Sequence, residues 1–152
     1  MRPCESSDEM VLREVYEDAI RACDRSLYSQ EQIEAWSSLS YLPGILDKPL
    51  REGKGWVSCV DKSIEAFAMK YPHNRLALLY CRGRSSRQGH ATALLHQIEK
   101  DTLQHRPFNL KTEASLCSYQ LLLRHGWTII APQEIQIGGV HFFRFLMEKT
   151  LH

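Results

Sequence analysis

The residues best suited to chemistry form a basic turn near the middle of the chain. Residues 82–89 include three arginines and two glycines, and they follow the apolar run 76–81. After the turn, apolar residues recur at helical spacing: Ala91, Leu94, Leu95 and Ile98. A helix that begins near Gly89 presents unpaired backbone N–H groups and the positive end of its dipole. We therefore expect a phosphate or pyrophosphate to bind at this turn.

Two common phosphate-binding motifs do not describe the turn. The Gly-Lys-Ser/Thr of the Walker loop is absent, and the dinucleotide fingerprint needs two further glycines. A glycine at position 89 lets an anion approach the backbone, and the small Ala91 leaves the first helical turn open. A solvated basic turn is the alternative, but the position of the arginines beside the helix start favours phosphate contact.

The hydrophobic pattern predicts the elements that position this turn. Residues 8–27 have the spacing of an amphipathic helix, and Ser29 with Gln32 predicts a capping box for a second helix that ends near Trp36. Residues 42–53 predict a loop. Strands are predicted at 56–60, 64–69, 76–81, 109–114, 127–137 and 140–147, with a short helix ending at Gly126. This order predicts one mixed α/β domain, residues 1–152, built around one sheet.

Length and composition agree with one folded domain. The chain has 152 residues, of which 43% are hydrophobic and 24% charged, and its net charge is +1. That balance gives no electrostatic reason to expect a nucleic-acid or anionic-membrane partner. No apolar run approaches the roughly 20 residues that span a bilayer, and the N-terminus has no apolar signal core. Five widely spaced cysteines predict reduced thiols, so we expect a cytoplasmic protein without a metal site.

The turn and its surroundings resemble the GNAT superfamily of N-acetyltransferases. The pyrophosphate loop of that family has the pattern Gln/Arg-x-x-Gly-x-Gly/Ala, and the segment from Ser86 to Ala91 matches it except at the first position. Similar segments also lie at 28–36, 79–81, 113–115, 124–127 and 145–149, so the resemblance covers nearly the whole chain. It implies a central mixed, mostly antiparallel sheet flanked by about four helices. It also implies acetyl-CoA as co-substrate.

The resemblance further implies which residues bind the cofactor. Backbone amides from Arg87 to Thr92 would hold the pyrophosphate, and Arg84 or Arg87 could replace the contact that Ser86 lacks. The strand before the turn would pair with the pantetheine arm. The predicted cofactor-binding residues are Leu79, Tyr80, Cys81, Arg84, Arg87, Gln88, Gly89, His90, Ala91, Thr92 and Ser115.

The acceptor amine must lose a proton before it can attack, and this requirement indicates the first catalytic candidates. A lysine-like amine with a pKa of about 10.4 is only about 0.1% neutral near pH 7.4, so a base or a water chain is needed. Glu113, in the strand beside the cofactor, is the first candidate, and Glu31 and Glu34 are weaker ones. The alternative for Glu113 is a structural carboxylate paired with Lys111.

On the thioester side, the resemblance assigns roles to a backbone amide and a tyrosine. The amide of Cys81 would polarise the thioester carbonyl, while its sulfur is incidental. Many family members protonate the leaving thiolate with a tyrosine at the position of Leu122. Tyr119 lies three residues earlier on the same helical face and is the candidate acid, with a core role as its alternative. A thiol with a pKa of about 8.5 can also leave as the thiolate.

We therefore expect direct transfer of an acetyl group from acetyl-CoA to a primary amine in a ternary complex. The alternative is a non-catalytic module of GNAT-like fold that binds acyl-CoA or a partner. A nucleic-acid-binding module is disfavoured, because no aromatic residues are interleaved with the arginines. The acceptor, a small-molecule or peptide amine, stays open among polyamines, amino acids, aminoglycosides and protein amines. An exposed edge strand makes a homodimer plausible.

Overall fold

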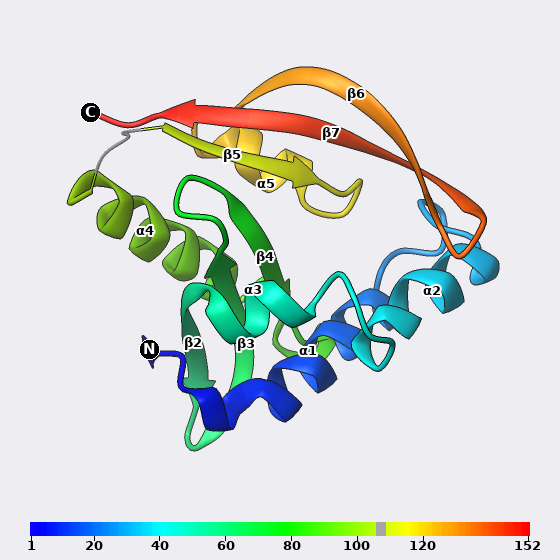
Figure 1. Cartoon of the computed structure of the whole chain (residues 1–152), viewed down its shortest axis with the longest axis horizontal. Helices are drawn as coiled ribbons and strands as arrows, with labels where there is room; N and C mark the ends of the chain where they lie inside the picture. Colours follow the sequence, from blue (N-terminus) through cyan, green and yellow to red (C-terminus); the bar gives the residue numbers. More distant parts are fainter. Residues whose placement is uncertain (106–108) are drawn as a thin grey trace.

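Two antiparallel β-sheets lie next to one another in the computed structural model, which describes residues 1–105 and 109–152 (Figure 1). The first sheet has the order β1 (Arg2–Pro3), β2 (Lys54–Val60), β3 (Ser63–Lys70) and β4 (Leu76–Cys81). The second has the order β5 (Asn109–Ala114), β7 (Val140–Thr150) and β6 (Thr128–Ile137). All six strands predicted from the sequence are present, and β4 and β5 have the predicted bounds.

Among the described residues, strand pairing joins the two sheets only where β4 and β5 begin. Arg75 and Lys111 form a single parallel bridge, and the amide of Lys111 donates to the carbonyl of Asn74 at 2.9 Å. The Thr112 hydroxyl adds a bond to the carbonyl of Leu76 at 2.7 Å. Beyond this point the strands diverge. The prediction of one continuous sheet is therefore wrong, because side chains of both strands line a cavity where further ladder bonds would have formed.

Five α-helices surround the sheets in the described part of the chain, where about four were expected. They are α1 (Glu9–Arg21), α2 (Gln30–Ser37), α3 (Asp47–Glu52), α4 (His90–Leu103) and α5 (Tyr119–Arg124), with 3₁₀ turns at Ser6–Asp8, Ser38–Ser40 and Gly83–Ser85. The predicted capping box opens α2, with Ser29 Oγ accepting from the Gln32 amide at 3.1 Å and Gln32 Oε1 accepting from the Ser29 amide at 2.9 Å. No described helix is both long enough and apolar enough to cross a membrane.

Two helix predictions need correction. The first helix ends at Arg21 instead of Leu27, because the chain turns at Asp24, whose carboxylate accepts from the amide of Ser26 at 2.8 Å. The segment predicted as a loop contains α3. Its Asp47 carboxylate accepts from the amide of Gly44 at 2.9 Å, and Leu50 is buried, so a local hydrogen bond and burial outweigh the prolines and glycines there.

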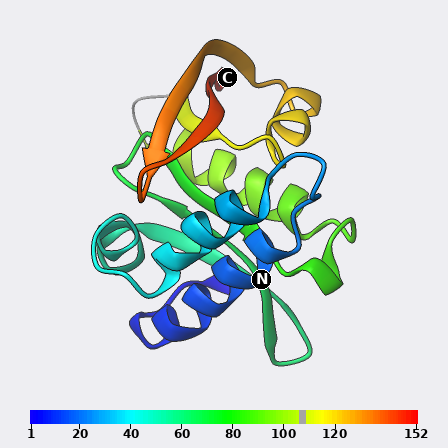
Figure 2. The same cartoon turned by 90° about the vertical axis from the view of Figure 1, so that its right-hand side faces the viewer.

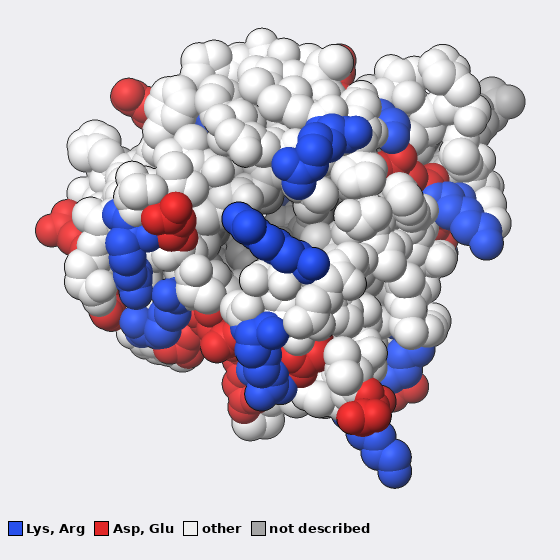
Figure 3. Space-filling view, turned by 180° about the vertical axis from the view of Figure 1, so that it is seen from behind, with Lys and Arg blue, Asp and Glu red and all other residues white. Residues whose placement is uncertain are grey.

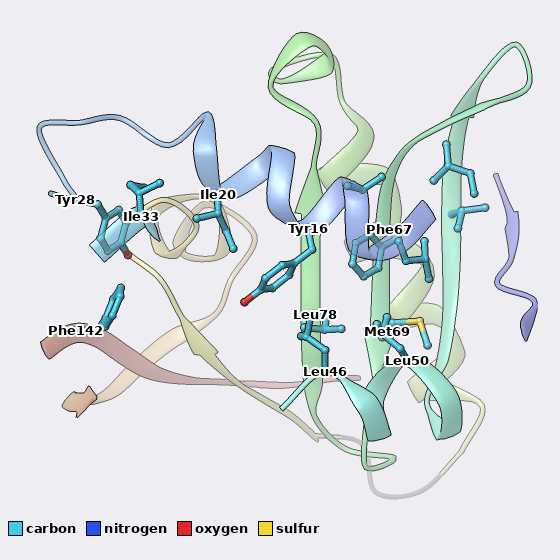
Figure 4. Close-up of a cluster of buried hydrophobic side chains, with 14 residues drawn as sticks. Tyr16, Ile20, Tyr28, Ile33, Leu46, Leu50, Phe67, Met69, Leu78 and Phe142 are labelled. Atoms are coloured by element: carbon cyan, nitrogen blue, oxygen red, sulfur yellow. The ribbon is translucent and has the colours of Figure 1, made fainter. Parts of the chain in front are cut away.

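The core has one hydrophobic cluster on each face of the first sheet. Alternate residues of β3 divide between them: Phe67 and Met69 pack towards α1, α2 and α3, whereas Ala66 and Ala68 pack towards α4. Figure 4 shows the first cluster extending from α3 along β3 and β4 to Tyr28 and Phe142. The tip of the β6–β7 hairpin and α2 lie on the same side of the molecule (Figure 2), where Gln32 Nε2 donates to the carbonyl of His141 at 3.0 Å.

A buried ion pair joins α4 to the first sheet. Lys70 Nζ lies 2.8 Å from Asp101 Oδ2, and both side chains are at most 6% exposed. Lys70 also donates to the Thr102 hydroxyl at 3.0 Å. Lys54 contacts the other oxygen of Asp101 at 2.6 Å, but its side chain is 58% exposed. The position of α4 on the sheet thus depends on a charged contact inside the core.

We expect Asp101→Asn to lower the free energy of unfolding by about 3–5 kcal/mol, because it leaves the Lys70 ammonium buried without a charge partner. Lys54→Ala is the matched control, since it removes the exposed partner of the same carboxylate and should cost at most about 1 kcal/mol. Urea denaturation of the three proteins measures both values. Equal losses in the two variants would contradict the assignment.

Candidate functional site

A cavity of about 360 Å³ lies where β4 and β5 diverge. One wall is β4, another is β5 with the start of α5, and the end towards α2 is closed by aromatic and aliphatic side chains. In Figure 4 the ring of Tyr16 points from α1 into the space beside Leu78, and Tyr28 and Phe142 face one another further along. The lining residues include Tyr16, Tyr28, Trp36, Arg75, Leu79, Tyr80, Glu113, Ser115, Leu122, Ile135, Phe142 and Arg144.

The backbone of β4 presents free hydrogen-bonding groups to this cavity. The amide of Arg82 donates to the carbonyl of Glu65 on β3 at 2.8 Å. Since hydrogen-bonding direction alternates along an antiparallel strand, the backbone groups of Cys81 and Leu79 point away from β3. Among the described residues, β4 has no strand partner on that side beyond the bridge at Arg75. An extended ligand can therefore pair with β4 there.

The predicted phosphate turn directly follows β4. Gly89 is the N-cap of α4 with a φ of 89°, and a Cβ atom at this position would meet nothing within 4 Å. No side chain caps the helix, so the first amides of α4 are available to a ligand. Nearby, His90 Nδ1 lies 2.7 Å from Ser58 Oγ, and Thr92 Oγ1 lies 3.4 Å from His125 Nε2. The opening in front of Gly89 fits an anionic group.

The three arginines of the turn have different surroundings. Arg84 donates from Nε and Nη2 to the carboxylate of Glu65 at 2.8 and 2.7 Å, and Arg82 lies 3.9 Å from the same carboxylate. Arg87 has a φ of 60° and, among the described residues, no acidic partner. Seen from behind (Figure 3), basic side chains lie above, across and below a hollow near the centre of the molecule. Arg87 is thus the arginine best placed to meet a phosphate.

Glu65 holds this turn against β3. It is 2% exposed, and in addition to Arg84 it accepts from Ser85 Oγ at 2.6 Å and from Ser63 Oγ at 2.7 Å. The hydrogen bonds from Arg84 outweigh desolvation and hold the pKa of Glu65 well below its ordinary value. The carboxylate therefore stays ionised and fixes the path of the chain into α4.

Glu113 lines the cavity but does not pair with Lys111. Its two carboxylate oxygens accept from Arg75 Nε at 2.9 and 3.2 Å, and Arg75 also donates to the carbonyl of Tyr71 at 3.1 Å. The alternative prediction, a pair between Glu113 and Lys111, is therefore wrong about the partner, because Glu113 forms its ion pair with Arg75. Glu31 and Glu34 lie on the exposed surface of α2, and Glu34 contacts Arg21 at 3.2 Å. Of the three glutamates, Glu113 alone lines the cavity.

Tyr119 is the first residue of α5, and its ring packs on Phe145 with ring centroids 4.8 Å apart. It is not among the residues that line the cavity, whereas the buried Leu122 is. The Cys81 thiol is half-buried at the end of β4. Burial, followed by the charges of Glu65 and Asp18, raises the pKa of this thiol, which disfavours a thiolate nucleophile.

Hydrogen bonds and neutral tyrosines shape the rest of the site. The Tyr28 hydroxyl accepts from the amide of Leu116 at 2.8 Å, and burial raises its pKa to about 12. Burial also raises the pKa values of Tyr16 and Tyr80, so all three tyrosines are neutral near pH 7 and none serves as a base. Ser115 Oγ lies 3.1 Å from Ser118 Oγ, and both residues line the cavity.

Sequence reasoning missed Glu65, Arg75 and Arg144. Glu65 had a usable signal, because it is the single charged residue in the otherwise apolar predicted strand 64–69 and a buried charge needs a partner. Arg75 and Arg144 had none, since an arginine just before a strand or among the residues of a strand is usually a surface residue. Among residues 1–105 and 109–152, no three His, Cys, Asp or Glu side chains come together in a group that could hold a metal ion.

Solved structures resemble this chain, although no family model and no curated protein matches it by sequence. The GCN5-related N-acetyltransferase "Aminotransferase, Class-II" of Rhodopseudomonas palustris matches with a TM-score of 0.93 and 21% identity, over 99% of this chain and 94% of that one. PaiA N-acetyltransferase of Thermoplasma acidophilum, in complex with coenzyme A, gives 0.74 and 17% over 99% of both. YncA of Salmonella typhimurium, with its cofactor acetyl-CoA, gives 0.66 and 14% over 99% and 92%. The chain has the fold of these structures, which confirms the predicted fold class.

We expect Glu65→Gln to lower the free energy of unfolding at pH 7 by about 1–3 kcal/mol, because Arg84 and the two serines lose a charged acceptor. A carboxylate with a lowered pKa contributes its full stability above about pH 4.3, the ordinary glutamate value, and loses it as the pH falls. The difference between wild type and variant should therefore shrink from pH 5 to pH 3. Thermal unfolding across this range measures it.

Glu14→Gln provides the control, since the Glu14 side chain is 65% exposed and its contact with Arg82 is long, at 4.0 Å. It should leave stability nearly unchanged at both pH values. A Glu65→Gln deficit that does not depend on pH would show that the carboxylate charge is not the stabilising feature.

Proposed function

We propose that the chain transfers an acetyl group from acetyl-CoA to a primary amine by direct transfer in a ternary complex. The divergence of β4 from β5, with the open start of α4 beside it, is the observation that carries this proposal. Two structures of the same fold contain coenzyme A or acetyl-CoA, which supports the same ligand here.

The residues of this chain fit acetyl-CoA. The backbone amides from Arg87 to Thr92 are the proposed pyrophosphate ligands, and the space in front of Gly89 is open to such a group. Arg87 is the proposed side-chain contact, because Arg84 already holds Glu65. The free backbone groups of Leu79 and Cys81 would pair with the amides of the pantetheine arm, and Ser115 stands across the cavity from them.

The reaction forms a bond from the amine nitrogen to the acetyl carbon and moves one proton from the amine to the sulfur. The amine nitrogen bonds to the acetyl carbon, the carbon–sulfur bond breaks, and the sulfur gains the equivalent of the proton that the amine loses. The amide of Cys81, which points away from β3, is the proposed donor to the thioester oxygen, on which negative charge develops. Glu113 is the proposed base for the amine, acting directly or through water.

Protonation of the leaving sulfur has two routes. Tyr119 is the candidate acid, and it would have to turn from its contact with Phe145 to reach the cavity. Departure as a thiolate needs no acid, since a thiol has a pKa of about 8.5. The buried Leu122, at the position where many related sequences have tyrosine, favours the second route.

The cofactor assignment predicts a ligand-dependent change in stability. A hundredfold excess of acetyl-CoA over its Kd should stabilise the wild type by about 2.7 kcal/mol, and Gly89→Glu should abolish this gain, because a carboxylate would occupy the pyrophosphate site. Gly89→Ala is the matched control, with the same backbone strain of about 1–2 kcal/mol but no charge. Thermal unfolding with and without acetyl-CoA gives the values. A gain in Gly89→Glu as large as that of the wild type would refute the phosphate assignment.

Direct transfer predicts that the Cys81 sulfur is dispensable. Cys81→Ala keeps the backbone amide, so kcat should remain within a few-fold of wild type, and initial-rate plots against both substrates should intersect. Steady-state release of free thiol measures the rates. Loss of activity with an intact fold, parallel plots and an acetylated protein detected by mass spectrometry would establish a covalent route instead.

A further inference from the structure

The end of the cavity that faces α2 is lined by an aromatic group. The rings of Tyr28, Trp36 and Phe142 lie 5.2–6.3 Å apart between centroids, and the Tyr80 ring lies 6.4 Å from Trp36 and 4.6 Å from Tyr16. Ile135 and Ile137 add aliphatic surface from β6. In Figure 4, Tyr28 and Phe142 approach this space from opposite elements. Such a surface stabilises an apolar or aromatic group far better than a hydrated polar chain.

The second sheet places two opposite charges on one face beside this surface. In the β5–β7 register Glu113 pairs with Leu146, so Arg144, two residues along, is its diagonal neighbour on the same face, about 7–8 Å away. Phe142 lies two residues further on that face, and Gln133 and Ile135 extend it on β6. Glu113 and Arg144 both line the cavity.

The guanidinium of Arg144 is available to an anion. Its Nε donates to Gln133 Oε1 at 3.0 Å, which fixes its orientation, and no carboxylate pairs with it in the described part of the chain. Arg75, the other arginine in the lining, is engaged by Glu113 and by a backbone carbonyl. A planar guanidinium with two free terminal nitrogens is suited to bidentate binding of a carboxylate.

We propose, on the basis of the function above, that the acceptor is an α-amino acid with an apolar or aromatic side chain. Its carboxylate binds Arg144, its amine lies on the Glu113 side, and its side chain occupies the aromatic surface at Tyr28, Trp36 and Phe142. Transfer forms the nitrogen–acetyl bond at the α-amine and breaks the carbon–sulfur bond, and the proton lost by the amine balances the one gained by the thiol. The product is an N-acetyl amino acid.

The same features disfavour the other acceptor classes. Two arginines and one paired glutamate line the cavity, so a polyamine or an aminoglycoside would bring further positive charge into a positively charged, largely apolar space. A volume of about 360 Å³, part of which the acetyl group and the pantetheine end would fill, is at the lower limit for small-molecule sites, which span about 300–1,000 Å³.

A comparison of acids with amides tests the proposal on the wild-type enzyme. Rates with acetyl-CoA are measured for leucine, methionine and phenylalanine, for phenylalaninamide and phenylalanylglycine, and for aspartate, spermidine and an aminoglycoside. We expect the highest kcat/KM for a free apolar amino acid, and a loss of about tenfold or more when its carboxylate becomes an amide. Equal rates for acid and amide, or preference for the dipeptide or a polycation, would overturn the proposal.

Variants at Arg144 locate the effect. Arg144→Gln should raise the KM for the free amino acid about 10–100-fold with a smaller change in kcat, and should bring the acid-to-amide ratio close to one. Arg144→Lys keeps the positive charge but not the two terminal nitrogens of the guanidinium, so its KM for the free amino acid should lie between those of the wild type and Arg144→Gln. Lys62→Gln removes a positive charge at the exposed β2–β3 turn and should change neither the KM for the free amino acid nor the acid-to-amide ratio. An unchanged ratio in Arg144→Gln would contradict the assignment.

Calorimetric binding of acetyl-CoA separates this proposal from the one on which it rests. If acetyl-CoA binds and only polycations or peptides are acetylated, the amino-acid proposal is wrong and the acetyltransferase function stands. If acetyl-CoA does not bind, both are wrong. Unchanged acetyl-CoA affinity in Arg144→Gln shows that the variant is folded and that its effect is confined to the acceptor.

Discussion

The carboxylate of Glu65 fixes the geometry on which the rest of the site depends. It lies in the buried part of β3 and accepts hydrogen bonds from Arg84, Ser85 and Ser63. These contacts set the direction in which the chain leaves β4, and so the position of Gly89 and the first amides of α4. A buried ionised group is costly unless it is fully satisfied, and here two of its three partners, Arg84 and Ser85, belong to the turn that leads into α4. Burial of one charge thereby orders the loop that is proposed to bind another.

The incomplete junction of the two sheets gives the molecule both of its proposed binding surfaces. The bridge at Arg75 and Lys111 fixes β4 against β5 at one end, and their divergence beyond it exposes the backbone of β4 and opens the cavity. Arg75 has a second role, because it holds Glu113 towards this space. The aromatic group behind it is assembled from α1, α2, β4 and β7, so the cavity closes only when both sheets are in place.

Local patterns predicted the elements well and their assembly less well. The strands at β4 and β5, the Ser29–Gln32 capping box and the glycine after α5 follow from hydrophobic periodicity and capping chemistry within a few residues. The short helix α3 was missed because two prolines and two glycines obscure it. The split into two sheets could not be predicted, since both strands that border it have ordinary strand patterns. Glu113 is paired with Arg75, which is 38 residues away in the chain, and Arg84 is paired with Glu65, which is 19 residues away. Both separations are beyond any local signal in the sequence.

The two ends of the cavity come from different stretches of chain, and this separation has an evolutionary consequence. The proposed acetyl-CoA contacts lie almost entirely in the contiguous residues 79–92, whereas the aromatic and charged groups at the other end come mainly from residues 16–46 and 133–144. Substitutions in the latter segments can change which amine fits without disturbing Glu65 or Gly89. Solved structures that share 14–21% identity with this chain match its fold over 99% of its length, so the fold itself tolerates extensive substitution.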